Sequence, residues 1–125
     1  MNKELEEIPK HMLKLGLSAL AHANRHACYW SIENDNWAEL SVLQAAHAAE
    51  ILIKARIAEE HPLLIFEQFP KISDEKVDMV TLFEKGKTIE WSDLPQRLWA
   101  SAGIKLPNIE MLRSFGKLRN GIQHF

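Results

Sequence analysis

The fold of this chain is decided by one stretch, Trp37–Glu60, which reads WAELSVLQAAHAAEILIKARIAEE. It contains no Gly or Pro and is rich in Ala, Leu, Ile and Glu, which are good or tolerable helix formers. At a rise of about 1.5 Å per residue, a helix over this stretch would be about 35 Å long, the length of a small domain. The stretch therefore predicts one long, uninterrupted helix that organises the rest of the protein.

Apolar residues lie on two sides of this helix, which indicates packed neighbours on both. Three polar residues interrupt one of these sides: His47, Glu50 and Lys54. Glu50 precedes Lys54 by four residues, the spacing of an ordinary ion pair on a helix surface, which contributes about 0.2–0.5 kcal/mol. Alternatively, the three residues form a polar island that faces a cavity or a partner subunit. Both interpretations remain open at the level of sequence.

A second long helix is predicted before the central one, with Pro9 in its first turn. A stripe about 60° wide on its helical wheel carries mostly small residues: Met12, Gly16, Ala19, Ala23, Ala27 and Trp30. Such a stripe predicts close contact between helices. The polar run 34–36 then breaks the pattern and supplies a cap for the next helix, so we expect a short turn and two antiparallel long helices.

Beside that stripe, His22 and His26 lie one turn apart, and Glu33 follows two turns later. These side chains could bind a transition metal, or they could belong to a boundary face that carries histidines by chance. No Cys, Asp or closer Glu completes a ligand set, so we predict neither a metal site nor a cofactor.

Shorter elements are expected after His61–Pro62, because proline disfavours helical geometry in the residue before it. Residues 63–66 should repack the end of the central helix. A short helix over 74–85 would follow, with Ser73 as its cap and Gly86 after its end. Its inward residues would be Val77, Val80 and Phe83, and residues 87–91 would form an extended connection.

Two further helices complete the chain. One begins at Ser92 or Asp93, tolerates Pro95 in its first turn and ends at Gly103. Its expected apolar contacts are Leu94, Leu98 and Trp99. Asn108 would cap the last helix, one side of which carries Leu112, Phe115, Arg119 and Ile122. The sequence thus predicts an all-α, compact bundle of four to five helices in a single domain, 1–125.

Composition and charge limit the classes of protein to which this chain can belong. Its 125 residues suffice for one domain, and 46% hydrophobic with 26% charged residues is ordinary for a globular protein. The net charge of −2 means that any anion site must be a local patch. Cys28 is the only cysteine, which suits a reducing compartment. Without a membrane span of about 20 apolar residues or a signal peptide, we expect a cytoplasmic protein.

The chain also contains four tryptophans. In a small helical domain, tryptophan most often anchors a core or an interface. Stacking on nucleobases is the alternative, but aromatic and basic residues do not alternate along this chain, so the sequence favours core positions.

The last eight residues, 118–125, read LRNGIQHF and combine a fixed cation, an amide and a group that titrates near neutrality: Arg119, Asn120 and His124. Cleavage of a phosphodiester needs a base for the attacking hydroxyl and a cation for the phosphate, and histidine with arginine can supply both. On one straight helix His124 lies about 140° from Arg119, so the two meet only if Arg119 reaches round, Gly121 lets the helix deform, or a second subunit contributes. The alternative is an Arg119 that pairs with a carboxylate such as Glu50.

This Arg-Asn-x3-His arrangement, followed by an aromatic residue, resembles the motif of the HEPN domain family (higher eukaryotes and prokaryotes nucleotide-binding). The run 45–55, AAHAAEILIKA, is similar to the second helix of HEPN proteins, where small residues precede a Glu and a Lys. The resemblance covers most of the chain in architecture and about twenty residues in motif. It implies a small helical bundle, commonly a homodimer in which two Arg-x4–6-His motifs meet at the interface.

Many members of this family are metal-independent endoribonucleases of toxin–antitoxin or phage-defence systems. Others are non-catalytic modules that dimerise or bind a partner nucleotidyltransferase or nucleic acid. By resemblance, His124 would be the acid/base at the ribose 2′-hydroxyl, Arg119 would hold the phosphate and Asn120 would orient both. Glu50 and Lys54, with His47 on the same face, would line the substrate cleft. In the family the final helix usually continues well past the histidine, so we expect the final helix of this chain, which stops at Phe125, to be cut short.

Overall fold

The computed structural model of the protein describes residues 3–28, 37–68 and 79–123. Within them the elements are α1 (Lys3–Cys28), α2 (Trp37–Glu60), η1 (Pro62–Ile65), α3 (Met79–Lys85), η2 (Trp91–Asp93), α4 (Leu94–Ala102) and α5 (Ile109–Gln123), where η marks a 3-10 helix. The β pairing of this part of the chain is limited to one antiparallel bridge, between Phe66 and Thr88. The prediction of an all-α helical bundle is confirmed.

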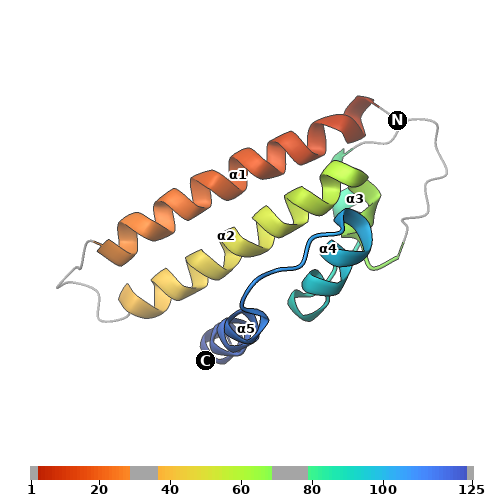
Figure 1. Cartoon of the computed structure of the whole chain (residues 1–125). Helices are drawn as coiled ribbons and strands as arrows, with labels where there is room; N and C mark the ends of the chain where they lie inside the picture. Colours follow the sequence, from red (N-terminus) through yellow and green to blue (C-terminus); the bar gives the residue numbers. More distant parts are fainter. Residues whose placement is uncertain (1–2, 29–36, 69–78, 124–125) are drawn as a thin grey trace.

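The two long helices, α1 and α2, lie side by side and run antiparallel, and the shorter helices gather along α2 (Figure 1). α2 contacts α1, η1, α4 and α5. Its buried apolar residues include Ala46, Ala48, Ala55, Ile57 and Ala58. Because α2 has neighbours on different sides, its apolar residues are not confined to one face. None of the described helices is long and apolar enough to cross a membrane.

Close packing of α1 against α2 depends on a glycine. A Cβ atom added at Gly16 would lie 2.8 Å from Leu52 Cδ2 and 3.1 Å from Ile51 Cγ2, so the Leu52 side chain would have to shift to make room for it. Met12 and Ala23, on the same stripe of α1, are buried. The predicted contact is confirmed at Met12, Gly16 and Ala23. The side chain of Ala27, the whole of Trp30 and the predicted turn at 34–36 lie outside the described part of the chain.

The predicted start of α1 is wrong. The helix begins at Lys3, so Pro9 lies inside it rather than in its first turn. Proline in a helix interior removes one backbone hydrogen bond and costs about 3 kcal/mol or more. Leu5 and Ile8, which come before the proline, are both buried in the core, and this burial offsets the cost. The apolar stripe of α1 thus extends two turns further towards the N-terminus than predicted.

After α2 the chain turns at His61, as predicted, and residues 62–65 repack as η1 rather than as a strand. The Leu63 amide donates to His61 Nδ1 over 3.2 Å, which caps this short helix. Residues 65–67 then pair with 87–89: the Ile89 amide donates to the Ile65 carbonyl (2.8 Å), and the Glu67 amide donates to the Lys87 carbonyl (2.9 Å). The predicted extended connection over residues 87–91 is therefore shorter than expected. It pairs over residues 87–89, and η2 already begins at Trp91.

The predicted helix over 74–85 is described only as α3, Met79–Lys85, and its predicted cap, Ser73, lies outside the described residues. α3 ends before Gly86 as predicted. Its predicted inward residue, Phe83, is 40% exposed, whereas Leu82 is buried. Phe83 still contacts Phe66, with ring centroids 5.7 Å apart. Leu82 is therefore buried in place of Phe83, while Val77 and the side chain of Val80, the other predicted inward residues, lie outside the described part of the chain.

α4 begins and ends close to the predicted residues, with Gly103 in the left-handed conformation (φ 70°) after its last turn. Leu94 and Leu98 are buried as predicted, but Trp99 is 54% exposed, so its predicted place in the core is wrong. α5 follows Asn108, whose carbonyl accepts the Leu112 amide over 3.2 Å. Asn108 therefore precedes the final helix as predicted, with a positive φ of 57°.

Candidate functional site

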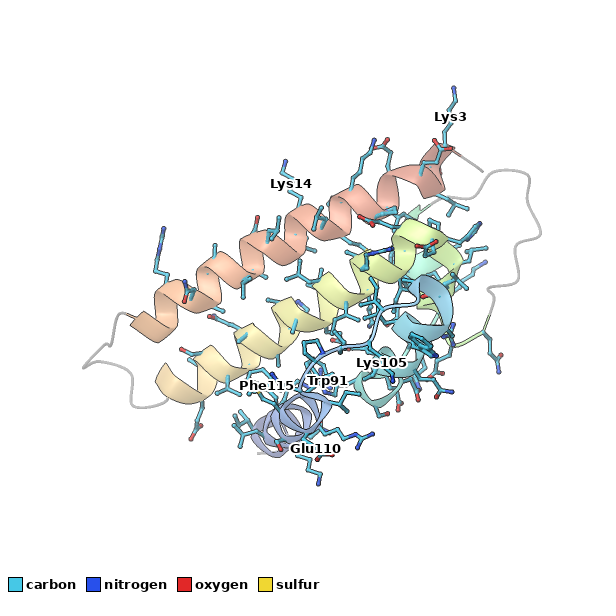
Figure 2. The ribbon with its side chains drawn as sticks, in the orientation of Figure 1. Lys3, Lys14, Trp91, Lys105, Glu110 and Phe115 are labelled. Carbon is cyan, nitrogen blue, oxygen red and sulfur yellow. The ribbon has the colours of Figure 1, made fainter. Side chains whose placement is uncertain are left out.

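One buried tryptophan fixes the final helix to the rest of the molecule. The Trp91 indole Nε1 donates to the Leu112 carbonyl over 3.1 Å, and its ring centroid lies 6.5 Å from that of Phe115. A Cβ added at Gly116 would lie only 2.5 Å from the indole, so this glycine lets α5 rest directly on the ring. In Figure 2, Trp91 and Phe115 lie together on one side of α5, and Glu110 lies on the other.

The same indole supports the predicted catalytic arginine. The guanidinium carbon of Arg119 lies 5.0 Å from the centroid of the Trp91 ring, within the range of a cation–π interaction. On its other side, Arg119 forms a 3.5 Å ion pair with Glu50 Oε2. The pairing of Arg119 with Glu50, left open by the sequence, is thus present in the structure. The Nε of Arg119 is buried and has no hydrogen-bond partner among the described residues, so the guanidinium retains donor capacity.

Glu50 bridges this arginine to a second cation. Lys54 Nζ lies 3.4 Å from Glu50 Oε1 and donates to Thr88 Oγ1 over 2.9 Å. Thr88 is held in place by its bridge to Phe66. The side chain of Lys54 is only 10% exposed. The predicted i, i+4 ion pair of Glu50 and Lys54 is therefore present, but it is largely buried and not on an open helix surface. Both residues also line a cavity, as the second interpretation expected.

That cavity is a groove of about 1030 Å³ between α2, the segment 87–92, α4 and α5. Among the described residues, six cationic side chains line it: Lys54, Lys87, Lys105, Arg113, Lys117 and Arg119. The carboxylates in this described lining are two, Glu50 and Glu90. We call this set of residues the cationic groove. Since the whole chain has a net charge of −2, the groove is the local positive patch that an anion site requires.

The two carboxylates of the cationic groove are both paired with cations. Glu50 contacts Lys54 and Arg119, and Glu90 lies 3.3 Å from Lys87. Together with Glu67, Glu90 raises the pKa of Lys87 above its ordinary value. The groove therefore contains both buried and exposed cations next to apolar side chains. Such cations bind phosphate groups through charge-assisted hydrogen bonds.

The structure brings four of the six predicted site residues together: Glu50, Lys54, Arg119 and Asn120 line the cationic groove. His47 is exposed and lines a neighbouring cavity of about 730 Å³, which it shares with Glu50 and Lys54. The predicted acid/base, His124, lies outside the described residues.

The possible metal ligands also lie mostly beyond the described part of the chain. His22 is exposed on α1, but the side chain of His26 and the whole of Glu33 lie outside it. Among the described residues, no three His, Cys, Asp or Glu side chains are grouped so that they could hold a metal ion.

Sequence reasoning missed several residues of the groove: Trp91, Thr88, Lys87, Lys105, Arg113 and Lys117. One signal could have revealed the cations. Residues 85–125 contain seven Lys or Arg and three Asp or Glu, an excess of positive charge in a chain that is negative overall. Nothing in the sequence singles out Trp91 from the other tryptophans, because its role comes from its contacts with a helix twenty residues away.

Comparisons of this chain with protein-family models, with curated proteins and with solved structures found no match. The chemistry of the site therefore rests on the residues in the groove.

Proposed function

We propose that the protein is a metal-independent endoribonuclease of HEPN type that acts in a toxin–antitoxin or phage-defence setting. The observation that carries this proposal is the position of Arg119: a largely buried guanidinium, 15% exposed, held by Trp91 and Glu50 at the wall of a cationic groove. A cation held in place in this way needs little reorganisation when negative charge develops on a phosphate, which favours catalysis.

The proposed reaction begins at the ribose 2′-hydroxyl of the RNA. His124 accepts the hydroxyl proton while the 2′-oxygen attacks the adjacent phosphorus atom. Arg119 stabilises the added negative charge on the phosphorane, and Lys54 adds a second cation nearby. The bond between phosphorus and the 5′-oxygen then breaks, and the 5′-oxygen takes up a proton from water. The products are a 2′,3′-cyclic phosphate and a 5′-hydroxyl, and Asn120 orients Arg119 and His124.

Cleavage should require no divalent metal. Mg²⁺ sites in proteins are built from one or two carboxylates together with substrate phosphates, and both carboxylates of the cationic groove are paired with Lys or Arg. We expect the full-length protein to cut a structured RNA in EDTA, with cyclic phosphate ends detected by mass spectrometry. DNA lacks the 2′-hydroxyl and should remain uncut under the same conditions.

The matched control for this assay is the Arg119→Ala/His124→Ala double variant, prepared in parallel so that a contaminating nuclease is recognised. Activity should rise with pH as His124 loses its proton, since histidine ordinarily titrates near pH 6.5. A strict need for Mg²⁺, or unchanged cutting by the double variant, would contradict the mechanism. If the full-length protein cuts no RNA, the alternative is favoured: a non-catalytic module that binds nucleic acid or a partner nucleotidyltransferase.

We further propose that the protein is a homodimer that uses the final helix. Of the two faces predicted from sequence, the one formed by Glu50 and Lys54 is largely covered within the protomer, with only His47 exposed. On α5, in contrast, Met111 and Leu118 lie two turns apart and are 68% and 54% exposed. An apolar stripe of this kind next to the groove suits an isologous contact, in which both copies use the same surface.

We expect light scattering at micromolar concentration to give twice the 14.4 kDa mass of one chain. Leu118→Glu should shift the mass to that of a monomer, because it places a charge on the exposed apolar side of α5. Leu17→Glu is the matched control, since Leu17 is equally exposed (53%) but lies on α1. A monomeric wild-type protein, or a Leu17→Glu variant that dissociates while Leu118→Glu does not, would contradict this arrangement.

A further inference from the structure

A second tryptophan of the cationic groove is only partly packed against the protein. Trp99 is the sixth residue of α4 and is 54% exposed, while Leu94 and Leu98 of the same helix are buried. Exposing half of a tryptophan forgoes much of the hydrophobic stabilisation that this large side chain could give. Trp99 nevertheless lines the groove that contains Arg119. Its aromatic ring is therefore available to a bound molecule.

A cation lies over the ring of Trp99. Lys105 Nζ is 5.8 Å from the centroid of this ring, and both side chains line the cationic groove. Lys105 belongs to the loop between α4 and α5, and Figure 2 shows it between these two helices. An aromatic surface with a cation beside it suits a ligand that has a flat ring attached to an anionic backbone.

The charge of the groove indicates which ligand this is. Six cations and two carboxylates line it, so an apolar protein surface without negative charge would be a poor occupant. A nucleic-acid strand carries one phosphate for each base. Its phosphates can contact the lysines and arginines of the groove while one base stacks on Trp99, as in proteins that bind single strands.

We propose that Trp99 is a stacking platform for one unpaired base of an RNA strand bound in the cationic groove. This inference builds on the proposed function, because it assigns a base-contacting residue to the same groove. In a duplex the bases are stacked on one another and are not free to contact a side chain. The protein would then select single strands because their bases are free to stack, whatever the base sequence of the strand.

The test measures binding without cleavage. A fluorescently labelled 2′-O-methyl RNA of ten nucleotides lacks the attacking hydroxyl, so the proposed reaction cannot cut it. Its affinity for the full-length protein is measured by fluorescence anisotropy, as a single strand and annealed to its complement. Trp99→Leu keeps an apolar side chain but removes the aromatic face, and Trp99→Phe keeps a smaller aromatic face.

We expect the single strand to bind more tightly than the duplex. Trp99→Leu should weaken single-strand binding about tenfold, within the range for the stacking of one base, and leave duplex binding unchanged. Trp99→Phe should stay within about threefold of the wild type. The slope of affinity against salt concentration should not change in either variant, because no phosphate contact is lost. Lys117→Ala, which removes a groove cation, should reduce that slope.

Three results would overturn the platform: equal affinity of Trp99→Leu and wild type for the single strand, equal affinity of the wild type for single strand and duplex, or no binding of the single strand. These results are independent of the cleavage assay in EDTA. If the protein binds as expected but cuts no RNA, the stacking role of Trp99 stands and the nuclease proposal fails. If the protein cuts RNA but Trp99→Leu binds the single strand as tightly as the wild type, the nuclease proposal stands and the stacking role fails.

Discussion

Replacement of Arg119 by alanine is expected to lower the rate of RNA cleavage by roughly 10²- to 10³-fold, the usual effect of removing a group that stabilises transition-state charge. The guanidinium contacts both the Trp91 ring and the Glu50 carboxylate, and among the described residues no other cation makes both contacts. Lys54, on the far side of Glu50, donates to Thr88 and cannot replace it. The measurement is a single-turnover cleavage assay in EDTA with a labelled RNA.

Two further variants separate the role of charge from that of shape and from general effects. Arg119→Lys keeps the charge but loses the planar guanidinium that stacks on an aromatic ring, so we expect only partial activity. Arg56→Ala removes an arginine of α2 that pairs with Glu59 and Glu60 away from the groove, and it should cleave at the wild-type rate. Retention of more than a fifth of the activity by a folded Arg119→Ala protein would rule out this role for the arginine.

The architecture could be predicted from sequence because its strongest signals are local. Trp37–Glu60 was predicted as one helix from the residues it contains and lacks, and α2 has those bounds. Gly103 likewise ends α4 where predicted, because a left-handed residue after a helix is a local requirement. Pro9 was misleading for the same reason. Its local preference for a first turn is overridden by the burial of Leu5 and Ile8, which is a tertiary effect.

The candidate site could be predicted only in part, because a groove is made by residues from distant parts of the chain. Glu50, Lys54 and Arg119 were singled out by spacing and by resemblance, and the structure places them within one network of contacts. Thr88 could not have been predicted, since its hydroxyl reaches Lys54 only after residues 87–89 pair with 65–67. Helical periodicity says which residues share a face, but not which loop covers that face.

The two tryptophans of the groove show the same limit most clearly. Sequence favoured core positions for both, yet Trp91 is 8% exposed and Trp99 is 54% exposed. The difference arises from α5, which packs on Trp91 through Gly116 and leaves Trp99 at the edge. One residue type thus has two roles, and the choice between them depends on where the last helix docks.

Truncation of Trp91 should therefore have the largest effect on stability. We expect Trp91→Ala to lower the free energy of unfolding by about 3–5 kcal/mol, as is usual for a large aromatic residue in a core. The loss includes the hydrogen bond to the Leu112 carbonyl and the contact with Phe115. For a domain whose total stability is of the order of 5–15 kcal/mol, this is a large fraction. Urea unfolding followed by circular dichroism measures it, with an expected fall in midpoint of about 2 M.

The matched control is Trp99→Ala, which makes the same truncation at a half-exposed position and should cost less than about 1 kcal/mol. Because Trp91 supports both α5 and the Arg119 guanidinium, Trp91→Ala should also weaken RNA binding under conditions in which α1 and α2 remain helical. Equal destabilisation by the two variants would contradict the docking of α5 on Trp91. So would a Trp91→Ala protein that unfolds like the wild type, since the final helix would then have to be held by other contacts.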